Sequence, residues 1–149
     1  MLEIGVRQGG STRALLHAAE VNDGHLQSID IDDCSAALPE ELKARRTFRQ
    51  GDTRQMLAEL LHSQDKTYDL VYVDGEHTKE AVAAELAALD LYVVPGGVIV
   101  LDDCWHAFPG VLEAFLEFQS IGVESKSLIQ YGTSQSYMGL DRALGVIRF

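Results

Sequence analysis

The chain has few cysteines, few prolines and few basic side chains, and it has no long hydrophobic run. Two of its 149 residues are cysteine and three are proline. We predict that Cys34 and Cys104 are free thiols, because two strands of the expected sheet lie between them and a disulfide cannot span that distance. No apolar segment approaches the roughly 20 residues that cross a bilayer, and no signal peptide opens the chain. We therefore expect a cytoplasmic protein that does not insert into a membrane.

Basic side chains are outnumbered by acidic ones. There are 12 Lys and Arg residues against 23 Asp and Glu residues, which gives a formal net charge of −11. Such a surface repels phosphate backbones and anionic lipids, so neither nucleic acid nor a membrane is expected as a partner. With 46% hydrophobic residues, the chain predicts one globular domain over residues 1–149.

Strand-like and helix-like segments alternate, with short turns between them. This pattern predicts an α/β fold: a doubly wound, mostly parallel sheet that ends in an antiparallel strand pair. The expected strands are Leu2–Val6, Leu26–Ile31, Thr47–Gln50 (an edge), Tyr68–Val73, Val98–Leu101, Glu124–Tyr131 and Ala143–Phe149. The expected helices are Thr12–Glu20, Ser35–Arg46, Thr53–His62, Lys79–Val93 (stopped by Pro95-Gly96-Gly97) and Pro109–Gln119.

Three aspartates follow two of the expected strands. Asp74 comes after Tyr68–Val73, and Asp102 with Asp103 comes after Val98–Leu101. Neighbouring parallel strands lie about 4.8 Å apart, so three carboxylates would meet at one rim of the sheet. Like charges at that distance require a cation or a bound proton. A hard divalent ion such as Mg²⁺ prefers oxygen ligands, so the pattern predicts a metal site. The alternative is that one aspartate caps a helix and the others pair with Lys or Arg.

The first strand-to-helix turn is rich in glycine. Gly5 and Gly9 allow a tight turn and a close approach of a ligand to the backbone. The helix that follows, with Ser11 as its expected N-cap, presents free N–H groups to an anion. Glu3 is an acid where dinucleotide-binding folds usually carry an apolar residue, and the glycine spacing differs from the dinucleotide Gly-x-Gly-x-x-Gly.

Two further acids follow the next two strands. Asp30 or Asp32 could accept hydrogen bonds from the hydroxyls of a ribose, and Asp30 is favoured because it lies nearer the rim. Both could also belong to a solvated turn. Asp52 could accept a hydrogen bond from an adenine amino group. Taken alone, Asp52 is better explained as the cap of the helix that begins at Thr53.

With these motifs in this order, the chain resembles the class I S-adenosylmethionine-dependent methyltransferases over nearly all of its length. It is most similar to the metal-dependent O-methyltransferases, which include catechol O-methyltransferase, the macrolide sugar O-methyltransferases and a cephalosporin hydroxylase-like group. The resemblance implies that S-adenosylmethionine contacts Glu3, Gly5, Gly9, Ser11, Asp30, Asp52 and Asp74. It also implies Mg²⁺ on Asp74, Asp102 and Asp103.

The segment Val-Asp-Gly-Glu-His-Thr resembles the Asp-x-x-His of the sugar enzymes, which makes His77 the expected general base. A metal lowers the pKa of a bound hydroxyl, and a nearby imidazole can take its proton. The alternative for His77 is a structural loop histidine. The acceptor implied is a small hydroxylated molecule. Trp105 and His106 are expected to line its pocket, with Tyr131, Tyr137 and Met138 at the border. The alternative for Trp105 is core packing.

The sequence departs from the family at its beginning. Related enzymes carry helices before the first strand, whereas here Met1 and Leu2 alone precede Glu3. We therefore expect a less covered site, which closure by homo-oligomerisation could complete. Two other functions stay open: a nucleoside-binding module without turnover, and a nicotinamide-dependent oxidoreductase, which Glu3 and the glycine spacing disfavour. The identity of the acceptor does not follow from the sequence.

Overall fold

The computed structural model describes residues 1–34, 43–62, 68–131 and 142–149. It contains a seven-stranded sheet in the order β3-β2-β1-β4-β5-β7-β6. Parallel pairing joins β3 through β5, and β7 pairs antiparallel with both β5 and β6. The strands are β1 (Leu2–Ile4), β2 (Leu26–Asp30), β3 (Arg46–Gln50), β4 (Tyr68–Val73), β5 (Val93–Leu101), β6 (Ser125–Tyr131) and β7 (Arg142–Arg148). The predicted fold class is confirmed.

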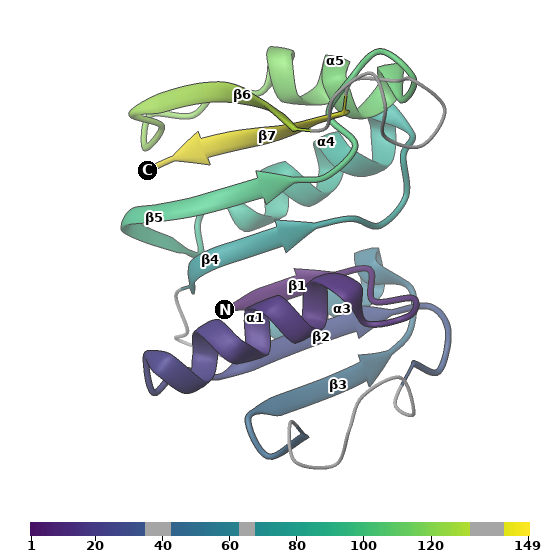
Figure 1. Ribbon diagram of the computed structural model, residues 1–149. Coiled ribbons are helices and arrows are strands. Elements are labelled where there is room, and N and C mark those ends of the chain that lie inside the picture. Colours follow the sequence, from purple (N-terminus) through teal and green to yellow (C-terminus); the bar gives the residue numbers. More distant parts are fainter. Residues whose placement is uncertain (35–42, 63–67, 132–141) are drawn as a thin grey trace.

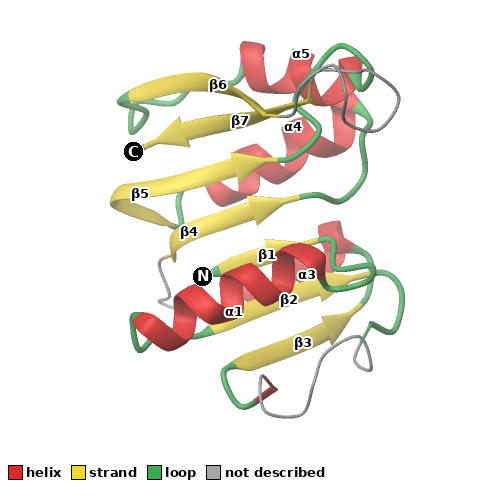
Figure 2. Ribbon diagram, viewed as in Figure 1, coloured by secondary structure: helices red, strands yellow, loops and turns green. Residues whose placement is uncertain are grey.

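Helices cover both faces of the sheet, as Figures 1 and 2 show. On one face α1 lies over β1 and β2, and on the other face α3, α4 and α5 pack side by side. The main core lies beneath these three helices and includes Val71, Leu86, Ile99 and Phe115, all buried. The helices are α1 (Gly10–Val21), α3 (Thr53–His62), α4 (Lys79–Leu89) and α5 (Pro109–Glu117).

Several predicted boundaries differ from the structure. The predicted helix over 79–93 ends at Leu89, with Asp90 as its C-cap. Val93 already pairs with Tyr68, so Pro95, Gly96 and Gly97 lie inside β5 rather than after a helix. The register shift in this ladder accommodates them, because proline and glycine are tolerated where a strand is irregular.

The predicted helix over 35–46 lies mostly outside the described residues. Its last residue, Arg46, is the first residue of β3 and pairs with Leu26. As predicted, β3 is an edge strand, and Cys34 and Cys104 are free and buried. No helix within the described ranges has the length and apolar character needed to cross a bilayer.

Candidate active site

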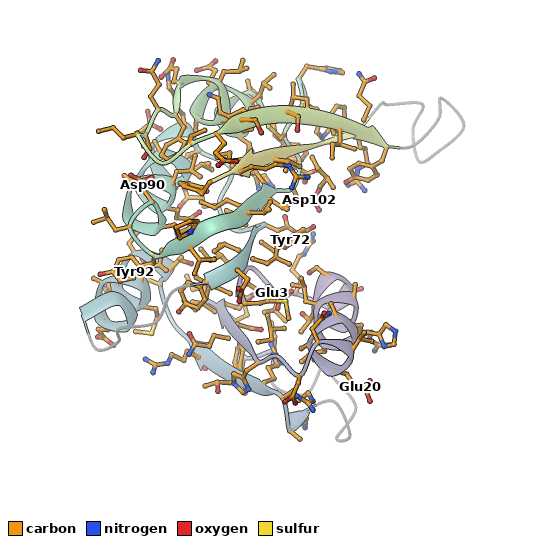
Figure 3. All side chains as sticks on the ribbon, turned by 90° about the vertical axis from the view of Figure 1, so that its left-hand side faces the viewer. Glu3, Glu20, Tyr72, Asp90, Tyr92 and Asp102 are labelled. Atoms are coloured by element: carbon orange, nitrogen blue, oxygen red, sulfur yellow. The ribbon has the colours of Figure 1, made fainter. Side chains whose placement is uncertain are left out.

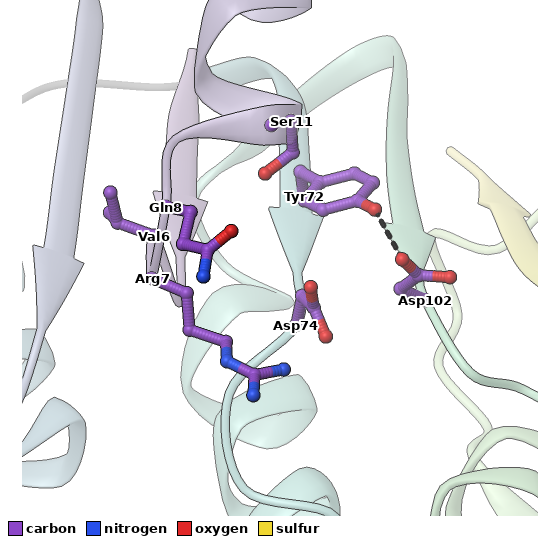
Figure 4. Close-up of a pocket in the computed structure, with 8 residues that line it drawn as sticks. Val6, Arg7, Gln8, Ser11, Tyr72, Asp74 and Asp102 are labelled. Carbon is purple, nitrogen blue, oxygen red and sulfur yellow. Dashed lines mark hydrogen bonds between the residues drawn. The ribbon is translucent and has the colours of Figure 1, made fainter. Parts of the chain in front are cut away.

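The carboxyl ends of the parallel strands meet at one rim of the sheet, and a pocket of about 400 Å³ opens there. Figure 4 shows the lining residues around it, which come from the β1–α1 loop, the start of α1, β4 and the segments that follow β4 and β5. Parallel pairing places β4 between β1 and β5, so these segments are neighbours. The lining residues are Val6, Arg7, Gln8, Gly10, Ser11, Tyr72, Asp74 and Asp102.

Two glycines shape the loop that enters this pocket. Gly5 has φ +86°, and a Cβ there would lie 1.9 Å from the carbonyl oxygen of Asp74. Because no side chain fits, Gly5 permits the β1 loop to touch the β4 loop. Gly9 has φ 74° and is the N-cap of α1. Ser11, predicted as the N-cap, instead lies inside the first turn, since the left-handed conformation at Gly9 starts the helix earlier.

Glu3 is fully buried on β1 and does not line the pocket. Figure 3 shows it among the strands. Its carboxylate accepts hydrogen bonds from the hydroxyls of Ser11 (2.8 Å), Thr12 (2.8 Å) and Ser28 (2.8 Å). Burial raises the pKa of Glu3, against the lowering effect of these bonds. The Glu3 carboxylate therefore holds the start of α1 against β1 and β2. The sequence motif at the end of the first strand did not indicate this structural role.

Asp30 binds the glycine loop from the end of β2. Its Oδ2 accepts from the backbone N–H groups of Val6 (2.6 Å) and Arg7 (3.0 Å), and its Oδ1 accepts from that of Asp32 (2.9 Å). Burial opposes ionisation, but these backbone donors outweigh it and lower the pKa of Asp30. Asp32 itself is exposed. Asp30 thus stays ionised at the rim, and it also fixes the loop conformation.

Asp52 caps α3, which is the role that the sequence favours when Asp52 is considered by itself. Its Oδ1 accepts from the backbone N–H of Arg54 at 2.9 Å, and its Oδ2 pairs with the Arg54 guanidinium at 3.0 Å. These hydrogen bonds lower the pKa of Asp52. It does not line the pocket, so its predicted contact with the cofactor stays a prediction.

Asp74, His77 and Asp103 form a cluster beside the pocket. One ligand atom from each lies within 4.8 Å of the other two. The imidazole Nε2 of His77 lies 3.3 Å from Asp103 Oδ2 and 3.8 Å from Asp74 Oδ1. Burial, followed by the charges of Asp102 and Asp103, raises the pKa of Asp74 to about 7. The crowding of carboxylates that the strand ends predict is therefore present for Asp74 and Asp103.

The position of His77 is set by two helices. Thr78, the N-cap of α4, accepts a hydrogen bond from the N–H of Ala81, which ends the loop that carries His77. At the start of α5, a Cβ on Gly110 would lie 2.4 Å from the His77 carbonyl oxygen, so this glycine permits close packing of the loop. The ring of His77 packs on that of Phe108, with centroids 4.5 Å apart. Its Nε2 is buried and forms no hydrogen bond within the described part of the chain.

Asp102, predicted to join the cluster, has other partners. Its Oδ2 accepts from the Tyr72 hydroxyl at 2.7 Å, and its Oδ1 accepts from the Tyr131 hydroxyl at 2.8 Å. Burial and the bond to Asp102 raise the pKa of both phenols, so they remain donors. Sequence reasoning missed Tyr72, although strand alternation places it on the same face as Asp74.

The residues expected around the acceptor lie in different environments in the structure. Trp105 is buried and donates from its indole nitrogen to Asp103 Oδ1 at 3.2 Å, whereas His106 is exposed. Lys79, the nearest base in sequence, pairs with Glu113 and Glu117 on α5 rather than with the aspartates. Tyr137 and Met138 lie outside the described residues.

Comparison with known proteins gives a consistent set of relatives. A family model described as a methyltransferase domain matches residues 2–104. Over 103 residues the chain is 34% identical to demethylmacrocin O-methyltransferase of Streptomyces fradiae, covering 68% of this chain and 25% of that enzyme. The chain thus spans about a quarter or less of the length of the curated relatives it matches.

Solved structures share the architecture. An O-methyltransferase from Bacillus cereus, in complex with SAH, has a TM-score of 0.78 at 19% identity, covering 99% of this chain and 73% of that one. The MycE methyltransferase of mycinamycin biosynthesis, in complex with Mg and SAH, has a TM-score of 0.64 at 22% identity, covering 98% and 44%. Both identities are below 25%, so these similarities concern the fold.

Proposed function

The chain belongs to the methyltransferase domain family, and from this premise we propose that it transfers a methyl group from S-adenosylmethionine to a hydroxyl oxygen of a small acceptor, assisted by a divalent cation. The predicted resemblance to the class I S-adenosylmethionine-dependent methyltransferases is confirmed. The observation that carries the proposal is the meeting of Asp74, His77 and Asp103 directly beside a pocket formed by a glycine loop and a helix N-terminus.

The cofactor would occupy the pocket at the rim. The first turn of α1, at Gly10 and Ser11, offers backbone N–H groups, and Arg7 adds a positive charge. These groups suit the carboxylate of an amino acid, whereas Asp74 and Asp102 suit its ammonium group. Ile31 is 69% exposed directly after Asp30, so an apolar surface lies where a ribose and its base would extend.

Two features of the cluster fit a divalent cation. The carboxylate oxygens of Asp74 and Asp103 lie within 4.8 Å of one another, close enough to share one ion, and the buried Nε2 of His77 faces both of them without a hydrogen bond among the described residues. Mg²⁺, when bound, would neutralise the carboxylates and lower the pKa of a coordinated acceptor hydroxyl. Asp74 and Asp103 would hold it. The place of Asp102 in this set, predicted from the sequence, stays a prediction.

His77 would act as the general base. Its ring is oriented by Phe108 and its backbone by the cap of α4, so the imidazole is held at the mouth of the cluster. A proton taken up at Nε2 would face Asp103 and Asp74. General-base catalysis of this kind contributes roughly 10²–10⁴ in rate. Removal of the imidazole should therefore reduce turnover more than it reduces cofactor binding.

The test begins with calorimetric titration of the protein with S-adenosylhomocysteine, with and without Mg²⁺. We expect binding in both conditions; absence of heat in both would contradict the cofactor assignment. Methyl transfer is then measured on a panel of hydroxylated macrolide sugars and catechols. His77→Gln should lose most turnover with cofactor affinity retained, whereas His17→Gln, on the exposed face of α1, should not.

Binding of S-adenosylhomocysteine without transfer to any acceptor would instead favour a nucleoside-binding module. The relatives are named for macrolide substrates, and an uncharged sugar hydroxyl is compatible with the acidic surface around the cluster. The cytoplasmic location, the oligomeric state and the absence of nucleic-acid partners stay predictions.

A further inference from the structure

The strand β6 forms one end of the sheet. It pairs with β7 along its whole length, from Ser125 to Tyr131, and no described segment pairs with its other side. Figure 1 shows it as the outermost strand, at the opposite edge from β3. In such a strand, alternate N–H and C=O groups point away from the sheet, so they can pair with another chain. β6 therefore offers a row of backbone donors and acceptors to a partner.

β6 lacks the features that usually prevent such pairing, which are proline, a bulge or a charged side chain at the edge. It contains no proline, and its ladder with β7 runs over seven pairs without a register shift. Its one charged residue is Lys126, whose ammonium group donates to the carbonyl oxygens of Phe115 and Leu116 at the end of α5, each at 2.8 Å. This charge is therefore directed towards α5. The opposite edge, β3, carries both Arg46 and Arg49.

Exposed apolar side chains are concentrated beside this edge. Among the described residues, eight large apolar side chains are exposed, and five of them lie between residues 116 and 131. Leu128 and Ile129, in the middle of β6, are 46% and 48% exposed, and they lie on opposite faces of the sheet because strand residues alternate. A second strand beside β6 would cover both of them at once. The five exposed residues are Leu116, Ile121, Leu128, Ile129 and Tyr131.

The charge around this edge indicates which partner fits it. Strands β6 and β7 carry three basic side chains, Lys126, Arg142 and Arg148, and no acid, in a chain with a net charge of −11. Two copies of so acidic a protein repel one another over most of their surface. The repulsion is least where the facing surfaces carry no carboxylate, and β6 has none along its length. The edge therefore suits a second copy of this chain, which presents the same acid-free strand.

We propose that two copies of this chain associate through β6, antiparallel about a two-fold axis at Leu128, so that their sheets become continuous. Such an interface is isologous, because both copies use the same strand. In this register Leu128 lies opposite the partner's Leu128, and Lys126 lies opposite the partner's Gln130, so no like charges face each other. Tyr131, at the end of β6, donates to Asp102 of the pocket at 2.8 Å, so the interface adjoins the candidate active site. The association does not depend on the proposed function.

Sedimentation velocity of the wild-type protein, from micromolar to submillimolar concentration, measures the association. Leu128→Glu and Leu128→Lys each place like charges opposite one another on the two-fold axis. Each variant should weaken dimerisation at least about 30-fold. An equimolar mixture of the two should form the mixed dimer, because opposite charges then meet. Leu91→Glu, at an 80% exposed position between α4 and β5, should leave dimerisation unchanged.

A wild-type protein that is monomeric at every concentration would overturn the proposal. So would variants that dimerise as the wild type does, or a mixture that stays monomeric although melting temperatures show both variants to be folded. Salt shortens the range of charge repulsion from about 10 Å at 0.1 M to about 3 Å at 1 M, so dimerisation of the wild type should strengthen. Weakening by salt would instead indicate that the basic strands bind an acidic surface of another copy, and would contradict the pairing of β6 with itself.

Discussion

On the β1 and β2 side of the rim, Glu3 and Asp30 are surrounded by donors, namely three hydroxyls and three backbone N–H groups. On the β4 and β5 side, Asp74 and Asp103 face each other and His77 instead. The pKa of Asp30 is lowered by its donors, whereas that of Asp74 is raised to about 7 by burial and like charges. The comparison teaches that the donors around Asp30 favour its charged form, whereas burial and like charges around Asp74 disfavour it.

The change expected to have the largest effect is Asp74→Asn, on the side without donors. It removes a proposed cation ligand, so methyl transfer should fall by at least about 100-fold. The melting temperature at neutral pH should stay the same or rise, because a buried like charge is removed. Steady-state kinetics and thermal unfolding measure the two effects. Asp69→Asn, at an exposed position of the same strand, is the matched control. A large loss of stability would show that Asp74 is structural.

The matching change on the other side is Glu3→Ala. It leaves the buried hydroxyls of Thr12 and Ser28 and the half-buried hydroxyl of Ser11 without their acceptor. The free energy of unfolding should fall by about 3 kcal/mol, as expected for unsatisfied buried polar groups. Denaturant unfolding gives the value, and Glu20→Ala on the exposed end of α1 provides the reference. An unchanged midpoint would mean that the hydroxyls find other partners.

A third acid, Glu85, sharpens the comparison because it lies on neither side of the rim. Glu85 on α4 is 3% exposed, and its Oε2 has no hydrogen bond to the described residues. Burial, and then the charge of Glu76, raises its pKa from 4.5 to about 7. The folded state therefore holds a proton that the unfolded state has released between these two values. Stability should fall as the pH rises from about 4.5 to 7, and should then level off.

The corresponding variant, Glu85→Gln, removes the part of this dependence that Glu85 contributes. Above pH 7 it should be more stable than the wild type by roughly 3 kcal/mol, the free energy that corresponds to this pKa difference. Below about pH 4.5 the two proteins should be alike. Unfolding followed from pH 4 to 8 measures the difference, with Glu80→Gln in the exposed first turn of the same helix as control. A constant difference across the pH range would contradict the raised pKa.

The smallest effect is expected from Thr78→Ala, which removes the N-cap of α4 next to His77. Loss of such a cap costs about 0.5–1 kcal/mol of stability. Turnover should fall modestly, because the loop that carries His77 becomes less fixed. Thr78→Ser keeps the hydroxyl and should restore both values. If alanine and serine behave alike, the cap does not position the loop.

The hydrophobic periodicity of the chain was sufficient to predict the sheet, its edge strand and the antiparallel strand pair at its end. It failed at residues 90–93, where apolar residues continue the helical pattern although the chain has turned into β5. It also predicted that this helix begins at Thr12 with Ser11 as its N-cap, since a sequence does not reveal the left-handed φ of Gly9. Local propensity sets the elements, but tertiary pairing sets where they begin and end.

The acids at the rim show the same division between what the sequence predicts and what tertiary packing decides. That carboxylates and an imidazole meet there follows from the sequence, because parallel strands deliver their following residues to one edge of a sheet. Which oxygens remain available does not follow from it. The donors to Glu3, Asp102 and Asp103 come from α1, β2, β4, β6 and the loop after β5, which only folding brings within hydrogen-bond distance. The order of residues thus determined the family and the rim at which these acids meet, and the packing of distant segments decided the hydrogen-bond partners of each acid.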